Sequence, residues 1–438
     1  MNSSASLPAI EPVATRSPRR RWIYLLLVVG VIFTSGLLAL FGWAHWQERL
    51  ARQALSEERF EDAQKHVDMA LRLRPGSAQL HLLAGRIARQ RGAYSEAEQH
   101  LSRCGQVGGM SEALQLEWLL IRCQRGDVDE LAPALLAAVD QHHGESAAIL
   151  EALAAVYIRE TRYLEALRCL DRWVELVPDS ARALDLRGWV NNQLDHRGQA
   201  ITDYELALQL QPNRSAVRLR LAEVLADSSR HPEAVPHLEK LRAADPENPA
   251  VLVLLARCWW QGQGRMDDAR SLLDSILAGQ PNMAEAQLQR GQLELACGNY
   301  ALAERWLRAA ITQTPHDPEA RYSLYLSLEG QDNKEQEAQQ ELAHWQQDRK
   351  IRDRLTRLLR TELDARPDNA DLDAEAGELL FQLGEDQRAL FWINRALVIN
   401  PRHVASHRAM VEYYQRTNNP VKAEEHRRLL AVSEERAN

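Results

Sequence analysis

The chain has 438 residues, of which 45% are hydrophobic and 26% are charged, and its glycine and proline contents are modest. This composition excludes an intrinsically disordered protein. The formal net charge is -8, and residues 1–43 contribute four arginines against one glutamate, so the remaining chain is the acidic part. An acidic body lacks the electrostatic field on which nucleic-acid binding depends, so no nucleic-acid partner is expected.

The N-terminal region is predicted to enter a membrane. Residues 1–18, rich in Ser, Ala and Pro, are expected to form a disordered tail. Residues 19–43 open with three arginines and continue in an uncharged run, Trp22–Trp43. As a helix this run is about 33 Å long, enough for a bilayer core of ~30 Å. We therefore predict a transmembrane helix that contacts the lipid bilayer through Trp22–Trp43.

The alternative for this region is a cleaved signal peptide. The apolar run is longer than the usual ~7–15 residues, and no clean Ala-x-Ala site follows it, so an uncleaved anchor is favoured. The arginines that precede the run place the N-terminus in the cytoplasm. The body is then expected to be extracytoplasmic, which means periplasmic if the protein is bacterial.

After Trp43 the sequence repeats itself with a fixed period. Five prolines are spaced 34, 34, 35 and 34 residues apart, and an alanine stands 12 residues before each of them. Self-similarity at this period indicates stacked helical repeats. The prolines are Pro178, Pro212, Pro246, Pro281 and Pro315, and the alanines are Ala166, Ala200, Ala234, Ala269 and Ala303.

Within one repeat the pattern is apolar or small at positions 4, 7 and 8, aromatic or Leu at 11, Gly or polar at 15, Ala at 20, large apolar at 24, Ala at 27 and Pro at 32. This pattern resembles the tetratricopeptide repeat (TPR). The best copies contain Leu150, Leu153, Ala154, Tyr157, Tyr163, Ala166, Leu170 and Pro178; Gly291, Gly298, Tyr300, Ala303, Leu307, Ala310 and Pro315; and Gly377, Leu380, Gly384, Ala389, Ile393, Ala396 and Pro401.

The pattern has a reason in packing. Small residues at positions 8 and 20 let the two helices of a repeat, A and B, cross closely. The proline at position 32 ends helix B because it moves the preceding residue out of the α region. The resemblance implies an all-α fold, a right-handed α-solenoid of stacked TPR helix pairs, preceded here by the transmembrane helix.

The pattern divides the body into three parts. Residues 44–347 are predicted to be a TPR array of about nine repeats, the third and ninth degenerate. Residues 348–366 are predicted to be an extra basic amphipathic helix, and residues 367–438 two further repeats with a C-terminal capping helix. The apolar residues of the extra helix share one face, and its basic face is either solvated or a site for an acidic partner or anionic lipid. These apolar residues are Ile351, Leu355, Leu358, Leu359 and Leu363.

No motif indicates catalysis. The chain has no phosphate-binding loop, no nucleophile elbow and no His-Glu-x-x-His motif. His142 and His143 with Glu145 are the nearest approach to a metal site, and exposed loop histidines are the commoner case. The five cysteines form no Cys-x-x-Cys pair and are expected to be buried free thiols, although an extracytoplasmic location would allow a Cys104–Cys123 disulfide. Because nearly every residue after Trp43 belongs to a repeat, we predict no enzyme, no cofactor and no metal.

Stacked helix pairs provide a concave face, lined by positions 2, 5, 9, 12 and 13 of helix A. We call these the inner-face positions. Aromatic and arginine side chains there have the composition of binding hot spots, although Trp189 and Trp260 could instead pack between helices. The predicted partner-binding groove contains Arg182, Asp185, Trp189, Asn192, Arg257, Trp260, Leu288, Gln292 and Tyr322.

These features predict a single-pass membrane protein whose TPR body is a scaffold or adaptor for a protein or peptide partner. The alternative is an assembly or maturation factor with a chaperone-like role. Such a factor would hand exported or cofactor-bearing proteins to a membrane complex.

Overall fold

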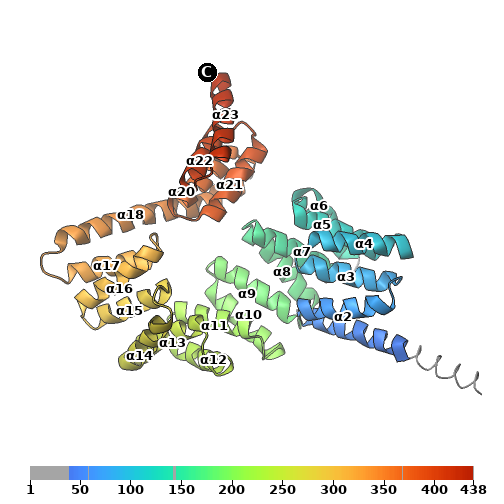
Figure 1. The fold of residues 1–438 in the computed structure, drawn as a ribbon, viewed down its shortest axis with the longest axis horizontal. Coiled ribbons are helices and arrows are strands. Elements are labelled where there is room, and N and C mark those ends of the chain that lie inside the picture. The colour runs from blue at the N-terminus through green and yellow to red at the C-terminus, as the bar shows by residue number, and fades with distance from the viewer. Residues whose placement is uncertain (1–38, 58, 142–144, 367, 438) are drawn as a thin grey trace, which may run out of the picture. The chain divides into compact units, whose positions relative to one another are not determined.

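The computed structural model describes residues 39–57, 59–141, 145–366 and 368–437 (Figure 1). Every regular element in these ranges is a helix. The helices form two compact units, the N-unit (Met1–His196) and the C-unit (Arg197–Asn438). The division falls between the two helices of the fifth repeat, which the uninterrupted sequence pattern did not indicate.

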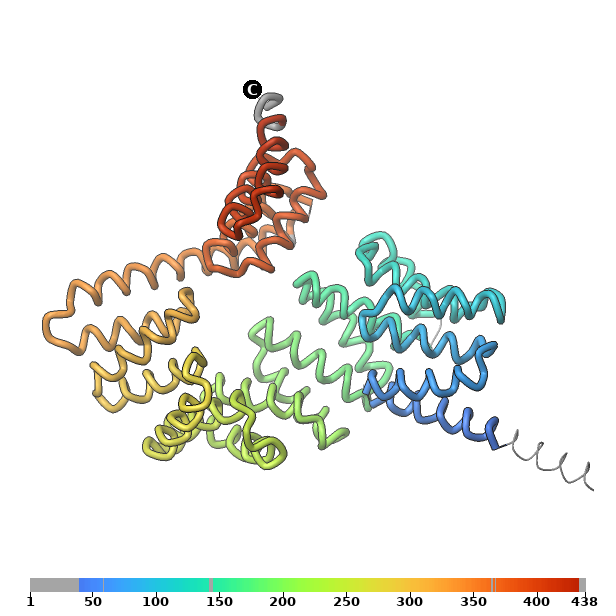
Figure 2. Tube along the Cα trace, in the orientation of Figure 1, coloured from blue at the N-terminus to red at the C-terminus, as the bar shows by residue number. Residues whose placement is uncertain are grey.

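In both units, consecutive helices run in opposite directions and pack side by side (Figure 2). The N-unit opens with a helix over residues 39–56. Its other helices are α2 (Phe60–Leu73), α3 (Ala78–Gln90), α4 (Tyr94–Gly108), α5 (Glu112–Arg125), α6 (Val128–Gln141), α7 (Ser146–Arg159), α8 (Tyr163–Leu176) and α9 (Ala181–Gln193).

The C-unit continues the pattern with helices that follow the predicted repeats. They are α10 (Arg197–Leu210), α11 (Ser215–Asp227), α12 (His231–Ala244), α13 (Pro249–Gln263), α14 (Met266–Gly279), α15 (Ala284–Ala296), α16 (Tyr300–Gln313), α17 (Pro318–Glu329), α18 (Glu335–Arg357), the π-helix η1 (Leu358–Glu362), α19 (Leu363–Ala365), α20 (Ala370–Gln382), α21 (Asp386–Ile399), α22 (Val404–Arg416) and α23 (Pro420–Ala437).

Local sequence sets the helix ends. Many A helices start directly after a residue whose side chain accepts a hydrogen bond from a backbone N–H of the first turn, as Ser180 does from Ala183. Helix B ends two residues before the proline of position 32, as predicted: α8 stops at Leu176 and α16 at Gln313. Position 15 takes a positive φ in the turn between A and B, which explains the preference for Gly or a small polar residue there.

Position 8 confirms the predicted close crossing of helices A and B. A Cβ atom added to Gly291 would lie 2.7 Å from Leu307, and one added to Gly377 would lie 2.5 Å from Ile393. Leu307 and Ile393 are the large residues of position 24. The space that a side chain at position 8 would occupy is therefore filled by the apolar residue of helix B. The alanines of position 20 are fully buried beside this contact, as Ala303 and Ala389 show.

The predicted extra helix is not a separate element. Helix α18 runs without a break from Glu335 to Arg357, so the expected boundary between 347 and 348 falls inside it. The π-turn that follows puts Leu358 and Leu363, five residues apart, on one buried face. The predicted apolar face packs on α20 in one cluster with Leu380. Part of the basic face is used internally, since Arg354 binds Glu362 and Glu375.

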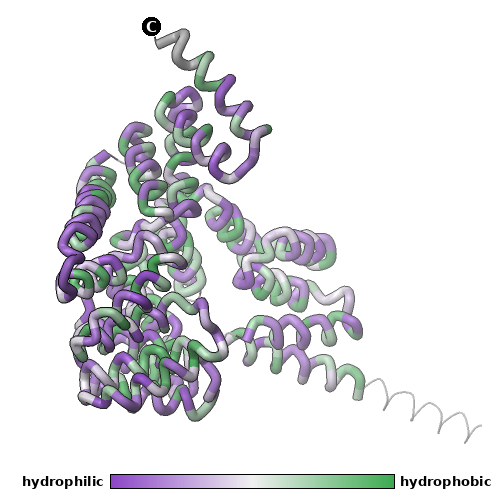
Figure 3. Tube along the Cα trace, turned by 60° about the vertical axis from the view of Figure 1, so that its left-hand side comes forward, coloured by the Kyte–Doolittle hydropathy of each residue, from purple (hydrophilic) through white to green (hydrophobic). Residues whose placement is uncertain are grey.

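The predicted membrane span lies mostly outside the described residues, which begin at residue 39. Among the described residues, no helix has the length and apolar character needed to cross a bilayer. The described part of the first helix starts with hydrophobic side chains (Figure 3). Leu40, Phe41 and Trp46 are exposed there, whereas Ala51 and Ala54 are buried in a core cluster with α2 and α3.

Candidate partner-binding surface

The predicted groove residues fall into two groups. Arg182, Asp185, Trp189 and Asn192 lie on α9 in the N-unit. Arg257 and Trp260 lie on α13, Leu288 and Gln292 on α15, and Tyr322 on α17, all in the C-unit. The two groups have different neighbouring residues.

The inner face of the N-unit is held together by ion pairs. Glu117 of α5 is 1% exposed and binds two arginines of α3, Arg86 and Arg89, each at 2.8 Å. Arg86 also donates a hydrogen bond of 3.1 Å to Glu145, 59 residues away. These contacts join α3, α5 and the start of α7. The arginines are therefore satisfied within the unit.

A second set of contacts continues along the same face. Glu151 of α7 accepts a hydrogen bond of 3.2 Å from Gln90 of α3 and forms an ion pair of 2.6 Å with Arg182 of α9. The Arg182 guanidinium also lies 5.6 Å from the centre of the Phe60 ring on α2. Arg182, predicted to bind a partner, is thus engaged with residues of its own unit.

The other three predicted residues of α9 are also packed. Asp185 is buried, and Trp189 is half-buried with its ring edge-to-face against Tyr163 at 5.8 Å. Asn192 is half-buried. For Trp189 the structure therefore agrees with the alternative interpretation, in which the indole packs between adjacent helices.

The inner face of the C-unit is more open. Arg257 of α13 is half-buried, and its Nη1 lies 2.9 Å from the carboxylate of Asp227 on α11. Three residues further on, Trp260 is also half-buried, and its Nε1 has no hydrogen-bond partner among the described residues. Gln292 donates a hydrogen bond of 3.3 Å to Ser323 of α17. These contacts link neighbouring A helices.

Two predicted residues of the C-unit differ in exposure although both occupy position 5. Leu288 is 3% exposed and belongs to the core cluster with Leu307 and Leu324. Leu288 therefore lies in the core and not on a groove surface. Alanines in the same cluster, Ala303, Ala310 and Ala320, let the neighbouring helices pack close to it. Tyr322 is 40% exposed and stacks on Trp345 of α18 with ring centroids 5.0 Å apart.

Two further inner-face residues of the C-unit are carboxylates. Glu223 of α11 and Glu285 of α15 are open to solvent, but protein surrounds them on the other sides. Partial burial raises the pKa of Glu223, and Asp227 raises it further. Partial burial also raises the pKa of Glu285, and the charges of Asp317 and Glu319 add to the effect. The two glutamates occupy positions 9 and 2, which are both inner-face positions.

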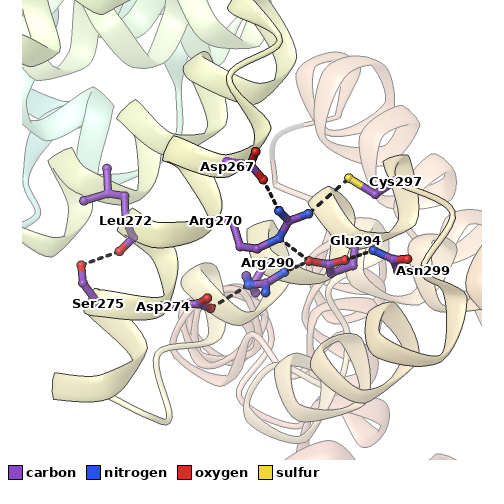
Figure 4. Close-up of polar contacts among 9 residues, drawn as sticks. All are labelled: Asp267, Arg270, Leu272, Asp274, Ser275, Arg290, Glu294, Cys297 and Asn299. Carbon is purple, nitrogen blue, oxygen red and sulfur yellow. Dashed lines mark hydrogen bonds and ion pairs between the residues drawn. The ribbon is translucent and has the colours of Figure 1, made fainter.

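A polar network between α14 and α15 provides a contrast (Figure 4). Glu294 is buried, and although burial raises its pKa, hydrogen bonds from Asn299, Arg270 and Arg290 lower it to about 2. Asp267 and Asp274 bind the outer sides of the two arginines, at 2.5 and 2.7 Å. Every charged group in this network has a partner of opposite sign, so it fastens two helices and offers no charge to a ligand.

Another recurring contact was not predicted. The side chain at position 4 binds the carbonyl oxygen of the preceding proline, as His81 does with Pro75 at 3.0 Å and His407 with Pro401 at 3.1 Å. Each of these histidines also faces a histidine of helix B: the Nδ1 atoms of His81 and His100 are 3.2 Å apart, and those of His407 and His426 are 3.0 Å apart.

His142 and His143, the residues nearest to a metal-binding pattern in the sequence, lie outside the described residues. The described residues contain no cluster of three or more metal-ligand side chains.

Family models agree with the repeat assignment. Two models described as tetratricopeptide repeat match this chain, one at residues 48–104, 193–249 and 219–282 and the other at residues 261–325. The chain contains tetratricopeptide repeats. Such repeats form extended concave surfaces that bind protein or peptide partners.

Curated relatives share only part of their length with this chain. Intraflagellar transport protein 70A of Bos taurus is 30% identical over 186 residues, which cover 40% of this chain and 28% of the relative. The Homo sapiens protein of the same name is 28% identical over the same coverage. The TPR chain thus spans about a quarter of the length of these relatives.

Three solved structures resemble part of this chain. PilW, described as a type IV pilus biogenesis factor, has a TM-score of 0.40, 18% identity, and coverage of 46% of this chain and 92% of that one. YrrB, described as a TPR protein with an unusual peptide-binding site, has a TM-score of 0.36, 21% identity, and coverage of 43% and 97%. Pseudomonas aeruginosa pilF has a TM-score of 0.34, 18% identity, and coverage of 57% and 97%.

Proposed function

We propose that this chain is a membrane-anchored TPR scaffold that holds a positively charged segment of a partner protein on the inner face of the C-unit. The observation that carries the proposal is the state of Glu223 and Glu285. Both side chains reach solvent, and partial burial together with neighbouring carboxylates raises the pKa of both. Crowded carboxylates cost free energy in the unbound protein, and a bound cation removes that cost.

The surroundings of these glutamates favour an extended basic segment over an acidic one. Arg257 is the central cation of the inner face, and Asp227 already pairs with it at 2.9 Å. The exposed ring of Tyr322 and the half-buried ring of Trp260 offer faces on which a lysine or arginine side chain can stack. The partner is therefore expected to present lysine or arginine residues.

The first helix supports the membrane part of the proposal. It is already helical at residue 39, within the predicted span, and it continues to residue 56 in the first repeat. Its exposed residues at this end include Trp43 and Trp46, which are typical of the interface between lipid and water. A continuous helix would hold the repeats at a fixed distance from the bilayer, with the N-terminus in the cytoplasm and the body on the other side.

Binding can be tested with defined peptides. The full chain in detergent is titrated against a fluorescent lysine- and arginine-rich peptide and against a glutamate-rich peptide of equal length, with anisotropy as the readout. We expect the basic peptide to bind in a salt-dependent way, and the double variant Glu223→Gln/Glu285→Gln to weaken binding by about tenfold. The matched control is Glu239→Gln, an exposed glutamate on α12.

The outcomes separate an inner-face site from general attraction to an acidic protein. Equal weakening by the control variant and the double variant would mean that net charge alone drives binding. Preference for the glutamate-rich peptide would overturn the proposal. Circular dichroism of each variant establishes that helical content is unchanged.

The anchor has its own test. The protein isolated from native membranes is expected to begin near Met1 and to resist extraction with alkaline carbonate. An N-terminus beyond Ala44 would show a cleaved signal peptide instead. Protease added from each side of sealed membranes then reports which side the repeats occupy.

A further inference from the structure

The outer face of the last helix, α23, is an exposed surface with both apolar and charged residues. Val421 is 77% exposed and Val432 is 50% exposed. Between them, Glu424 and Arg428 lie one helical turn apart, with their side chains 3.4 Å from each other. A hollow of about 660 Å³ on this face is lined by Pro420, Val421, Glu424, Glu425, Arg428 and Leu429.

Helix α16 carries the same pair of charges at the same two positions of its repeat, 21 and 25. There Glu304 and Arg308 lie 2.9 Å apart, and the first turn of α18 with the residue that precedes it supplies an ion of opposite sign to each. Lys334 lies 2.7 Å from Glu304, and Glu337 binds Arg308. A Glu–Arg pair at these positions is thus a surface on which another helix with complementary charges packs.

We propose that a second copy of this chain packs on α23, with the two α23 helices antiparallel across a twofold axis near His426. The arrangement is self-complementary. With the axis at 426, Glu424 of one copy faces Arg428 of the other, and Val421 of one faces Ala431 of the other, next to Val432. Residues 421, 424, 428 and 432 also lie within one narrow stripe of the helix, because their spacings of 3, 4 and 4 follow the helical period.

Symmetry makes the second copy a better fit than an unrelated helix. In a twofold interface every contact occurs twice, so a Glu and an Arg placed equally on either side of the axis satisfy each other in both copies. The exposed Val421 and Val432, five and six residues from the axis, add apolar contact at both ends. A contact limited to one helix per copy is small, so we expect a reversible dimer whose population depends on concentration.

Charge reversal tests the register directly. The full chain in detergent is studied by sedimentation velocity over a range of protein concentrations. We expect Glu424→Arg alone and Arg428→Glu alone each to raise the dimer dissociation constant by about tenfold or more, because each places like charges opposite one another twice. The double variant Glu424→Arg/Arg428→Glu restores opposite charges across the axis and should return the dissociation constant to within about threefold of the wild type.

The other outcomes are equally definite. Glu239→Arg on α12 is the control, and it should leave dimerisation unchanged. A wild-type chain that remains monomeric at every concentration overturns the proposal. So does a double variant that remains as weak as the single ones, because the covering helix would then belong to another protein or another register. Unchanged circular dichroism shows that a loss of dimer is not a loss of fold.

Discussion

The inner faces of the two units use charged residues in opposite ways. In the N-unit, Glu117 is buried between Arg86 and Arg89, and Glu151 bridges Gln90 and Arg182. In the C-unit, Glu223 and Glu285 remain exposed and lie near other carboxylates. The inner-face charges of a repeat can therefore either pair within the unit and stabilise it, or remain accessible to a ligand.

The difference follows from where each cation is placed. In the N-unit each carboxylate described above has a partner on a helix that packs close by, so the charges neutralise one another. In the C-unit Arg257 is near both Asp227 and Glu285, and one cation cannot neutralise the several carboxylates around it. Substitutions should therefore affect stability in the N-unit and binding in the C-unit.

The largest effect is expected from Glu117→Gln. The substitution leaves the buried guanidinium of Arg89, only 2% exposed, without a counter-charge, and loss of one partner of a buried ion pair costs ~3–5 kcal/mol. Urea denaturation followed by circular dichroism would measure the loss. Hydrogen exchange of peptides from α3 and α5 should locate the loss in the N-unit.

Two matched variants check this prediction. Glu98→Gln removes an exposed ion pair with Arg125 in the same unit and should cost below about 1 kcal/mol. Asp227→Asn removes the half-exposed partner of Arg257 in the C-unit and should also have a small effect. If Asp227→Asn were as costly as Glu117→Gln, the two inner faces would not differ in the way described.

A smaller effect is expected from acidification. His81 is bound to the Pro75 carbonyl through Nε2, so its Nδ1 accepts a hydrogen bond from Nδ1–H of His100. Burial, with a contribution from His81, lowers the pKa of His100, while Glu96 and Asp68 act in the opposite direction. His100 therefore binds a proton less readily in the folded N-unit than in the unfolded chain, and the free energy of unfolding should fall as the pH decreases through about 6.5.

The C-unit should respond differently over the same pH range. Burial lowers the pKa of His426 in the same manner, but burial also raises the pKa of Asp373, a fully buried carboxylate beside Arg395, to about 6. Protonation of Asp373 stabilises the folded state as the pH falls through 6, so the two effects oppose each other. Hydrogen exchange at pH 7.5 and 5.5 should show lost protection in α3 and α4 and a smaller change in α20–α23. His100→Gln should remove most of the loss in the N-unit.

The sequence predicted the architecture well because each repeat position has one packing role. Alanine at position 20 and proline at position 32 specify the helix crossing and the helix end, and the structure confirms both.

The continuation of α18 through residue 348 was not predicted, because no helix-ending residue or motif distinguishes a longer helix from two consecutive helices in the sequence. Of the groove residues, Leu288 proved to be core, since a periodic rule cannot tell how far a particular position is covered by its neighbours. The polar contacts of the N-unit join residues 28 to 61 positions apart, so they become visible only when the helices are stacked in three dimensions.

The smallest effect, and the one with the opposite sign, is expected from Glu285→Gln. Because the folded state raises the pKa of Glu285, its charged form is less favourable in the folded protein than in the unfolded chain at neutral pH. The glutamine removes this charge and can keep the hydrogen bond with Gln289, now 3.4 Å. Solvent screens the exposed side chain, so we expect a gain of only about 0.5 kcal/mol in the free energy of unfolding. The gain should vanish below pH 4.5, where the wild-type carboxyl is protonated in both states. A loss of stability would instead show that Glu285 has a structural role like that of Glu117. A small gain in stability together with weaker binding of the basic peptide would show that Glu285 binds the ligand at a small cost in stability.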